Sequence, residues 1–410
     1  MQKLKGLFAA SLKLKPLNNN PYHSIIMKVL HICNGFAGSK VHVNLAKALD
    51  SFGINQILYC PVRERSLIGK NQFLGNYIEF VYSYCIKSWY KYVFHYKAYK
   101  LYQDLKRNVD LNSINIIHAH TLFSDGVLAY KAKKEFSIPY IVAVRNTDVN
   151  GFVHLMKHCH SIGREILLNA EKVFFISQAL KNTFEQSSFV KPILNKVKDK
   201  FILSPNGIDD YWHDHISHDA HKGHNVLYIG DFSSNKNVVR LAKAVLKLRK
   251  EESFGDARLI IIGGAKDCKD KSKTQATINA NTMSIKALGK IYDKDKLAEV
   301  MRYCSVFAMP SIHETFGLVY LEALSQNLPV LYTKGQGIDG LFDNTVGVGV
   351  NPKSVDDIST GLRELLLHHD KYGNQHVNFA LFDWKIIAQN YANYYDEILI
   401  QQTSTLSHHL

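Results

Sequence analysis

The chain has 410 residues, of which 46% are hydrophobic and 21% are charged, an ordinary composition for a globular protein of two or three domains. No stretch approaches the ~20 apolar residues that a membrane-spanning helix needs, so none is predicted. The formal net charge of +14 favours an anionic partner, such as nucleic acid, acidic lipid headgroups or a phosphorylated substrate. The six cysteines are scattered without a CxxC pair, which is typical of free thiols in a reducing, cytoplasmic compartment.

Residues 1–26 form a basic leader with four lysines and no acidic residue. Its apolar piece, residues 7–12, is too short for the core of a signal peptide. One interpretation is a basic amphipathic helix on a membrane surface. The other, which we adopt, is a leader that precedes a domain beginning at Met27.

From Met27 to residue 205, short apolar runs alternate with segments of helical spacing. Residues 27–33 predict a strand, 34–40 a glycine-containing loop, and 41–53 a helix closed by Gly53. Further strands are predicted at 55–60, 114–120, 139–145, 171–177 and 200–203. Such alternation predicts an N-terminal Rossmann-like domain over 27–205, with a parallel sheet covered on both faces.

The same alternation of apolar runs and helical spacing starts again near residue 222 and predicts a second Rossmann-like domain over 206–380. Strands are predicted at 224–230, 257–264, 284–289, 306–310 and 328–332, and helices at 237–250, 294–304 and 355–366. A further helix, 381–402, is expected to return to the N-terminal domain and to be followed by a tail at 403–410. The predicted fold is therefore α/β, with two doubly wound domains that face each other across a cleft.

One stretch, "SIHETFGLVYLEAL" at 311–324, places Glu314 and Glu322 on either side of Phe316-Gly317 within apolar surroundings. A buried carboxylate is costly unless something pairs with it. The two glutamates therefore either solvate a helix surface or hold a polar ligand at the end of a strand.

Together with "SPNGID" (204–209), "YIGDFSSNKN" (228–237), "LIIIGG" (259–264) and "ALGKI" (287–291), this stretch resembles the GT-B glycosyltransferases. The resemblance is closest to the large retaining family numbered four, and it covers about residues 27–402. It implies a nucleotide-diphosphate sugar donor, bound between the domains without a metal or another cofactor.

The resemblance also implies roles for individual residues around the donor. Glu314, Lys236 and Arg145 are the expected catalytic residues, with Glu314 on the sugar and Lys236 on the leaving diphosphate. Glu322 is expected on the ribose. The backbone amides at the start of a helix are expected to meet the diphosphate, from residues Phe316, Gly317, Leu318 and Val319.

Other expected donor contacts are Gly35 and Gly38 in the first loop, Gly230, and Lys290 with Ile291, whose backbone would meet the base. Lys40 is a possible extra cation. The first loop satisfies neither the P-loop pattern nor GxGxxG, which argues against a dehydrogenase.

Two positions depart from the family pattern. Where many members have a histidine followed by glycine, this chain has Arg145 and Asn146, followed by Thr147 and Asp148. Arginine does not act as a base at physiological pH, so Arg145 is predicted to bind, with Asn146 and Asp148 near the acceptor. Asp231 replaces a common arginine, and it must point away from the diphosphate, be compensated, or weaken the site.

Three acidic or histidine-rich stretches resemble metal-binding motifs, but we assign a metal to none of them. "YDKDK" (292–296) is interpreted as a helix cap. "HDHISHDAHKGH" (213–224) is interpreted as a solvated linker, because its spacing fits no zinc pattern. "HLMKHCH" (154–160) offers two histidines on one helix face without a third ligand, which favours a structural or acceptor-site role.

Residues 82–103 contain four lysines, many aromatic residues and no acidic residue. This composition suits a membrane interface or a lipid-linked acceptor, a helix that fills the domain core, or single-stranded RNA. We favour the membrane or lipid-linked acceptor and expect no nucleic acid.

The resulting hypothesis is a retaining, metal-independent glycosyltransferase of surface polysaccharide biosynthesis (lipopolysaccharide or capsule). It would use a UDP- or GDP-sugar and a glycan or lipid-linked acceptor, in the cytoplasm or peripherally at the inner face of the plasma membrane. The alternatives are a nucleotide-sugar 2-epimerase on the same fold and a catalytically weakened partner protein.

Overall fold

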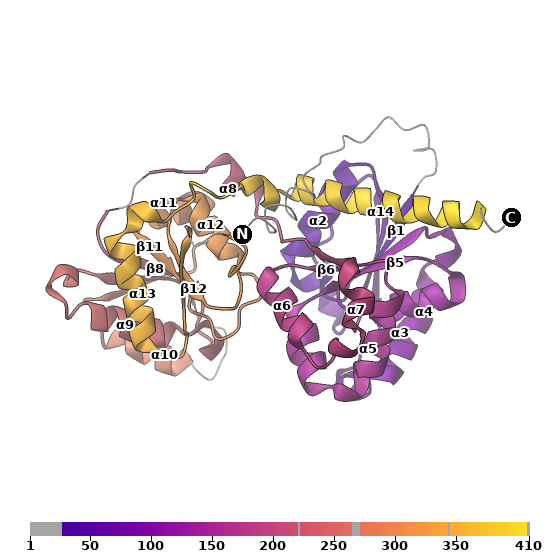
Figure 1. Cartoon of the computed structure of the whole chain (residues 1–410), viewed down its shortest axis with the longest axis horizontal. Coiled ribbons are helices and arrows are strands. Elements are labelled where there is room, and N and C mark those ends of the chain that lie inside the picture. The colour runs from indigo at the N-terminus through magenta and orange to yellow at the C-terminus, as the bar shows by residue number, and fades with distance from the viewer. Residues whose placement is uncertain (1–26, 220–221, 265–270, 343–344, 408–410) are drawn as a thin grey trace.

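The computed structural model describes residues 27–219, 222–264, 271–342 and 345–407. The predicted leader at 1–26 and the last three residues of the predicted tail lie outside these ranges. Figure 1 shows two lobes side by side, each a sheet flanked by helices, which we call the first and second lobe in chain order.

The first lobe is built on a seven-stranded parallel sheet in the order β3-β2-β1-β4-β5-β6-β7. Its strands are β1 Lys28–Ile32, β2 Asn55–Val62, β3 Ile78–Tyr84, β4 Ile116–Ala119, β5 Tyr140–Val144, β6 Lys172–Phe175 and β7 Phe201–Leu203. The sequence analysis does not predict β3, an edge strand in which Glu79 and Ser83 interrupt the apolar residues and none of the side chains is fully buried.

The second lobe is built on a six-stranded parallel sheet in the order β10-β9-β8-β11-β12-β13. Its strands are β8 Asn225–Asp231, β9 Arg258–Gly264, β10 Ile285–Gly289, β11 Val306–Ala308, β12 Val330–Thr333 and β13 Gly347–Val350. The predicted fold class, two doubly wound α/β units, is therefore confirmed. The glycine-rich β13 is a strand that the sequence analysis does not predict.

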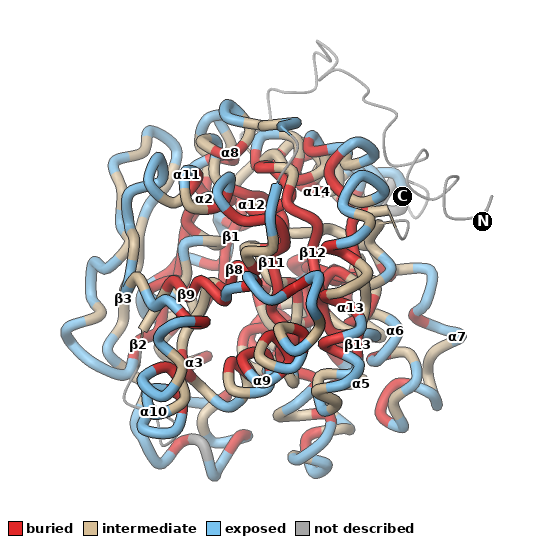
Figure 2. The backbone as a smooth tube through the Cα atoms, turned by 90° about the vertical axis from the view of Figure 1, so that its left-hand side faces the viewer, coloured by how far each residue is buried: buried red, intermediate tan, exposed pale blue. Residues whose placement is uncertain are grey.

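Helices cover both sheets, and their buried faces form the core together with the central strands, as Figure 2 shows. In the first lobe they are α2 Lys40–Ser51, α3 Phe94–Asn108, α4 Gly126–Phe136, α5 His160–Asn169, α6 Gln178–Gln186 and α7 Leu194–Val197. Beyond β7 they are α8 Asp210–Asp214, α9 Val238–Leu248, α10 Lys271–Asn279, α11 Lys294–Tyr303, α12 Leu318–Ser325, α13 Val355–Leu367 and α14 Trp384–Ser407. Within the described ranges, no helix has both the length and the apolar character that crossing a bilayer would require.

Helix α3 shows how the aromatic segment 82–103 divides between core and surface. Its buried side chains recur every three or four residues: Phe94, Ala98, Leu101, Tyr102 and Leu105. Between them, Tyr96 and Tyr99 remain exposed. The core interpretation is therefore right for one face of the helix, and the other face is free for a different role.

Helix α14 runs back along the first lobe and packs against α2, as Figure 1 shows. Its buried side chains, among them Trp384, Tyr391 and Tyr395, form one cluster with residues of α2 and of the central strands. At the crossing between the lobes, the Ile208 amide donates to the Phe382 carbonyl over 2.9 Å. The two passages of the chain between the lobes are thus tied to each other.

Gly207 is the residue at this crossing with the least room. A Cβ atom placed there would lie 2.7 Å from two ring atoms of Trp384 and 2.9 Å from the Phe382 carbonyl oxygen. Its backbone is not left-handed, so glycine is required here by the close approach of the Trp384 ring rather than by the turn.

We predict that Gly207→Ala lowers the free energy of unfolding by about 1–3 kcal/mol, because the added methyl group overpacks this contact. The measurement is a urea titration. Gly151→Ala is the control, because in the described part of the chain no atom lies within 4 Å of a Cβ at that position. An unchanged midpoint for Gly207→Ala would show that the Trp384 ring moves aside freely.

Candidate functional site

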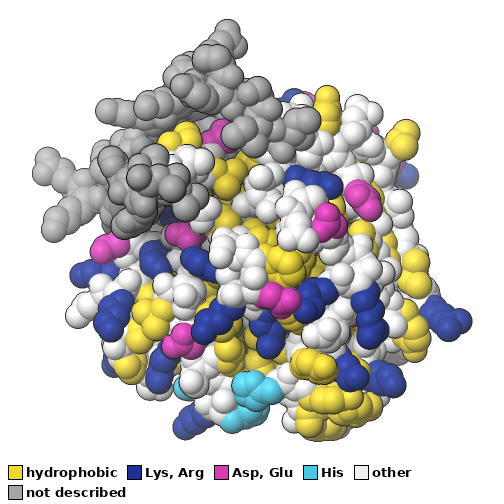
Figure 3. Space-filling model, turned by 90° about the vertical axis from the view of Figure 1, so that its right-hand side faces the viewer, with side chains coloured by type: hydrophobic (Ala, Val, Ile, Leu, Met, Phe, Trp, Pro, Cys, Tyr) yellow, Lys and Arg dark blue, Asp and Glu magenta, His cyan; other side chains and the backbone are white. Residues whose placement is uncertain are grey.

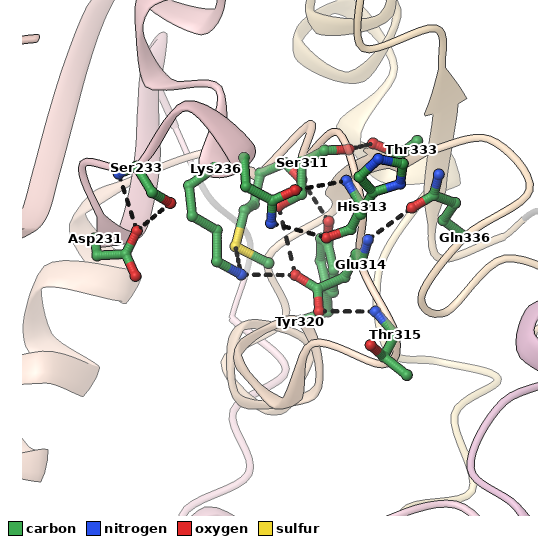
Figure 4. A network of polar contacts seen from close by, with 12 residues as sticks. Asp231, Ser233, Lys236, Ser311, His313, Glu314, Thr315, Tyr320, Thr333 and Gln336 are labelled. Atoms are coloured by element: carbon green, nitrogen blue, oxygen red, sulfur yellow. Dashed lines mark hydrogen bonds and ion pairs between the residues drawn. The ribbon is translucent and has the colours of Figure 1, made fainter. Parts of the chain in front are cut away.

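The centre of the candidate site is an ion pair between Lys236 and Glu314. Lys236 lies in the short 3-10 turn that follows β8, and Glu314 lies in the loop that follows β11. Because β8 and β11 are parallel neighbours, their carboxyl ends reach the same edge of the sheet. Lys236 Nζ is 2.8 Å from Glu314 Oε2, and both side chains are mostly buried (Figure 4).

The loop that carries Glu314 is held on both sides by side-chain hydrogen bonds (Figure 4). Asn235 accepts from the amide of His313 and donates to its carbonyl, each over 3.0 Å. The Glu314 amide donates to Gln336 Oε1 over 2.6 Å. Glu314 Oε1 accepts from the amide of Thr315 over 3.1 Å. The carboxylate is therefore fixed in place rather than free to turn into solvent.

Helix α12 begins directly behind this pair, at Gly317. Gly317 has a φ of 77°, in the left-handed region that favours glycine. Among the described residues, no side chain caps the helix. Leu318 and Val319 are half-buried, and Phe316 is buried. The first amides of α12 thus carry the partial positive charge of a helix N-terminus beside Lys236 and Glu314.

Glu322 lies one helical turn further along α12, next to Asp209 and Lys294. The pKa of Glu322 is raised to about 7, because burial and the charge of Asp209 raise it more than Lys294 lowers it. Lys294 Nζ lies 2.5 Å from Asp209 Oδ1. Glu322 is therefore a carboxyl group whose charge changes near neutral pH, separate from the Lys236–Glu314 pair.

The glycine loop of the first lobe approaches this part of the second lobe. Burial raises the pKa of Asp209, but Lys294, the Tyr211 amide and the charge of Lys40 lower it below its ordinary value. Lys40, at the start of α2, therefore acts across the lobes. Gly38, two residues before it, has no atom of the described residues within 4 Å of a Cβ position, so this part of the structure leaves its backbone open to a ligand.

Other contacts join the lobes near Glu314. Ser177, the cap of α6, donates from its hydroxyl to the Thr315 carbonyl over 2.8 Å. The Gln178 side chain packs against Gly340. The loop after β6 thus lies against the Glu314 loop.

Arg145 lies after β5 and bonds within the first lobe. Its Nε donates to the His120 carbonyl over 3.3 Å, and its Nη1 donates to Asn206 Oδ1 over 3.4 Å. Its side chain remains half-buried near Asn206, in the segment that links the two lobes. Its neighbour Asn146 is also half-buried and accepts from Asn150.

Asp148 requires a correction, because it does not face an acceptor as the sequence predicts. It is buried, and its two carboxylate oxygens accept from the amides of Leu122, Phe123 and Arg145 at 2.8–3.1 Å. Burial raises its pKa to about 6, against the effect of these amides. Asp148 therefore ties the turn after β5 to the turn after β4.

Asp231 turns its carboxylate toward its own chain. Its Oδ1 accepts from the Ser233 amide over 3.0 Å and from the Ser233 hydroxyl over 2.6 Å, as Figure 4 shows. These bonds close the turn that leads to Lys236. The Ser233 amide and hydroxyl thus compensate part of the charge of Asp231 locally.

Of the remaining predicted donor residues, three lie at the carboxyl ends of β8 and β10, and Gly35 lies after β1. Gly230 is in backbone contact with Gly263, where a Cβ would lie 1.9 Å from the Gly230 carbonyl oxygen. The exposed Lys290 extends along Gly264, and Ile291 is half-buried. Gly35 begins the 3-10 turn Phe36–Gly38 and contacts His42.

Hydrogen bonds within the protein explain two of the three stretches that resemble metal-binding motifs. Asp293 caps α11 by accepting from the amides of Asp295 and Lys296, so the cap prediction for 292–296 is confirmed. In the described part of 213–224 the histidines bond separate partners; for example, His218 meets Asn374, and His224 meets Asp256.

The sequence analysis missed a histidine cluster in the first lobe. Five side chains gather near the ends of β1 and β4: His31, Cys33, His42, His118 and His120. The available signal is the alternation of "HIC" and "HAH", which places each pair on one face of its strand.

Comparison with known proteins identifies the family of the chain and supports its fold. The family model "Glycosyltransferase Family 4" matches residues 38–212, and "Glycosyl transferases group 1" matches residues 212–378. The chain is 24% identical over 384 residues to an uncharacterized glycosyltransferase of Methanocaldococcus jannaschii, covering 91% of this chain and 99% of that protein.

A shorter match, 25% identical over 184 residues, is to the GDP-mannose:cellobiosyl-diphosphopolyprenol alpha-mannosyltransferase of Xanthomonas oryzae pv. oryzae. It covers 43% of this chain and 48% of that protein. The crystal structure of Anabaena HepE in complex with UDP and glucose superposes with a TM-score of 0.59 at 16% identity, over 93% of this chain and 99% of that one. The two family models adjoin at residue 212 and together span both lobes, and the chain belongs to the GT-B glycosyltransferases of group 1, family 4.

Proposed function

We propose that the protein is a retaining glycosyltransferase that transfers a sugar from a nucleotide-diphosphate donor without a divalent metal. The observation that carries this proposal is the Lys236–Glu314 pair at the start of α12. A fixed ammonium group and free helix amides converge there, as the departure of a diphosphate requires.

The chemistry follows from the charge that develops on the leaving group. When the sugar–phosphate bond breaks, the diphosphate gains negative charge, which Lys236 and the amides from Phe316 to Val319 stabilise. Since these groups are held before the donor arrives, little reorganisation is needed during the reaction. Glu314 accepts hydrogen bonds from hydroxyl groups of the donor sugar and orients it.

The rest of the donor extends along the edge of the second sheet. Glu322 accepts from the ribose hydroxyls, and the backbone at Lys290 and Ile291 meets the base. Gly35, Gly38, Gly230 and Lys40 complete the surroundings of the diphosphate, and Arg145 binds from the first lobe. The Anabaena structure in complex with UDP and glucose supports a uridine or related nucleotide donor.

Asp231 favours an active enzyme over a weakened partner protein. Its carboxylate is engaged by Ser233, so donors already compensate part of its charge before any diphosphate binds. Calorimetry with UDP and GDP separates these two possibilities, because a partner protein that has lost the donor site binds neither nucleotide. A nucleotide-sugar 2-epimerase would instead release a changed nucleotide sugar without any acceptor.

The proposed acceptor is a glycan or lipid-linked sugar of a surface polysaccharide pathway, reached at an anionic membrane. The support is a surface that we call the aromatic patch, formed by the exposed residues Tyr84, Trp89, Tyr92, Tyr96 and Tyr99. The Trp89 and Tyr96 rings stack at 5.4 Å. The ammonium group of Lys100 lies 5.5 Å from the Tyr96 ring.

Aromatic rings with lysines between them suit the interface of an anionic bilayer. Figure 3 shows lysines and arginines spread among hydrophobic side chains over the outer face of the first lobe. The relative from Xanthomonas oryzae pv. oryzae is named for a diphosphopolyprenol acceptor, which supports a lipid-linked acceptor here.

Replacing Lys236 by alanine should lower turnover roughly 100-fold or more, because one preorganised donor to the leaving group is lost. The assay is sugar transfer or donor hydrolysis. Lys243→Ala is the matched control, an exposed lysine on α9. Equal turnover of both variants would remove Lys236 from the mechanism.

Donor affinity should improve between pH 6 and pH 8. The pKa of Glu322 is raised to about 7, so the group is protonated below and ionised above this value, and the ionised form is the stronger acceptor for ribose. The expected gain is roughly fivefold, measured by calorimetry. Glu322→Gln should flatten the profile, and a variant with the same slope as the parent would contradict the assignment.

Binding to vesicles tests the aromatic patch. The double variant Tyr92→Ser/Tyr99→Ser should weaken co-sedimentation with phosphatidylcholine vesicles that contain phosphatidylglycerol, and added salt should weaken binding of the parent. Tyr292→Ser/Tyr303→Ser, which changes two exposed tyrosines of the second lobe, is the control. Equal binding of both variants would argue against membrane contact through this patch.

A further inference from the structure

Histidine and cysteine side chains, the types that often bind metals, gather on one face of the first sheet beside the glycine loop. His31 and His118 are register partners on β1 and β4. Cys33 lies two residues after His31, and His120 lies two residues after His118. Because side chains alternate between the two faces of a strand, all four side chains lie on the same face of the sheet. His42 reaches this face from α2. The group thus begins in the core beneath α14 and ends at the glycine loop.

Several nitrogen atoms of this group are left without hydrogen bonds. His31 Nδ1 bonds His120 Nε2 over 3.1 Å, and His118 Nδ1 bonds the Tyr395 hydroxyl over 2.7 Å. The other nitrogens of these rings, and Nδ1 of His42, are buried with no hydrogen-bond partner among the described residues. A neutral imidazole carries one donor and one acceptor, so changing tautomers moves this deficit but does not remove it. Buried nitrogen atoms without a partner are expected to contact an ion or a buried water molecule.

Within the described residues, two sets of three have ligand atoms within 4.8 Å of one another: His31 with His118 and His120, and Cys33 with His42 and His120. Ring orientation separates them. The His118 and His120 rings are stacked, with 10° between their planes, so their lone pairs point in parallel planes. The His42 and His120 rings are at 78°, and their lone pairs are able to converge on one ion.

The charges around Cys33 also suit a cation. A buried divalent ion needs negative charge nearby. Cys33 would supply one negative charge by releasing its thiol proton when the ion binds. Asp125 is fully buried, interacts electrostatically with Cys33, and has an Oδ2 with no hydrogen-bond partner among the described residues. Arg145 opposes the ion, since it also acts electrostatically on His42 and His120.

We propose that Cys33, His42 and His120 bind a zinc-like divalent ion through one thiolate and two imidazoles. This donor set suits a borderline ion such as Zn²⁺ better than Mg²⁺ or Ca²⁺. His31 is the positioning residue, because its contact with His120 Nε2 leaves Nδ1 of His120 to face the ion.

The ion has a structural role that is separate from the metal-independent transfer chemistry. Cys33 and His42 flank the loop that contains Gly35 and Gly38, so an ion bound to both closes the base of this loop. Amide hydrogen exchange of residues 34–41 should therefore slow when the ion binds.

The test uses the full chain, stripped by a chelator and titrated with Co²⁺ as a spectroscopic substitute for Zn²⁺. Stoichiometric binding should produce a thiolate-to-cobalt charge-transfer band in the near ultraviolet. Cys33→Ser should abolish this band. Cys304→Ser should retain it, because Cys304 is a buried free thiol of the second lobe.

A folded parent protein that shows no thiolate band with Co²⁺ overturns the proposal, and buried water then accounts for the unpartnered nitrogens. Cobalt binding that survives Cys33→Ser but is lost in His118→Asn overturns it in favour of the three-histidine set. Calorimetry with UDP on the same samples reports the donor site independently, so failure of either assignment is recognised separately.

Discussion

The site depends on one contact, the ion pair between Lys236 and Glu314. Two charged groups from different strand ends meet at 2.8 Å in a mostly buried position, directly before a helix that has no side-chain cap among the described residues. Each partner reduces the cost of burying the other, and the nearby helix amides favour negative charge. The arrangement holds a positive charge and a free helix end ready for an anionic group. The hydrogen bonds of Asn235 and Gln336 hold the loop of Glu314 in this geometry. An ion pair between Lys236 and Glu314 that was exposed to solvent would be much weaker.

The two-lobed architecture places that contact where a second set of groups reaches it. The chain crosses between the lobes at Ile208 and again at Phe382, and these crossings are bonded to each other. The ring of Trp384 fills the space over Gly207, and α14 then packs along the first lobe. Ser177 and Lys40 of the first lobe thereby act on Thr315 and Asp209 of the second. Family membership shows a glycosyltransferase. The proposed nucleotide-sugar donor rests on this geometry, and the proposed acceptor rests on the aromatic patch.

Much of this arrangement was predictable from particular residues. Apolar runs such as 257–264 and the helical spacing of 237–250 each match an observed element, because both sheets are parallel and buried on two faces. The strands β3 and β13 were not predictable in this way, since an edge strand and a glycine-rich strand lack a continuous apolar signal. Asp148 was assigned to an acceptor because it follows Arg145 and Asn146, which stand where many family members have a histidine and a glycine. That resemblance does not distinguish a ligand-binding residue from one that holds two turns together.

The sequence by itself determined the alternation of strands and helices, the division into two units, and the spacing of Glu314, Gly317 and Glu322, because these depend on neighbours along the chain. Only the tertiary structure decided that Lys236 reaches Glu314 across 78 residues, and that α3 buries one aromatic face and exposes the other. It alone brought Cys33, His42 and His120 together from two strand ends and a helix. Such contacts depend on strand order and on the packing of helices over the sheet, and no local pattern encodes which strand lies beside which.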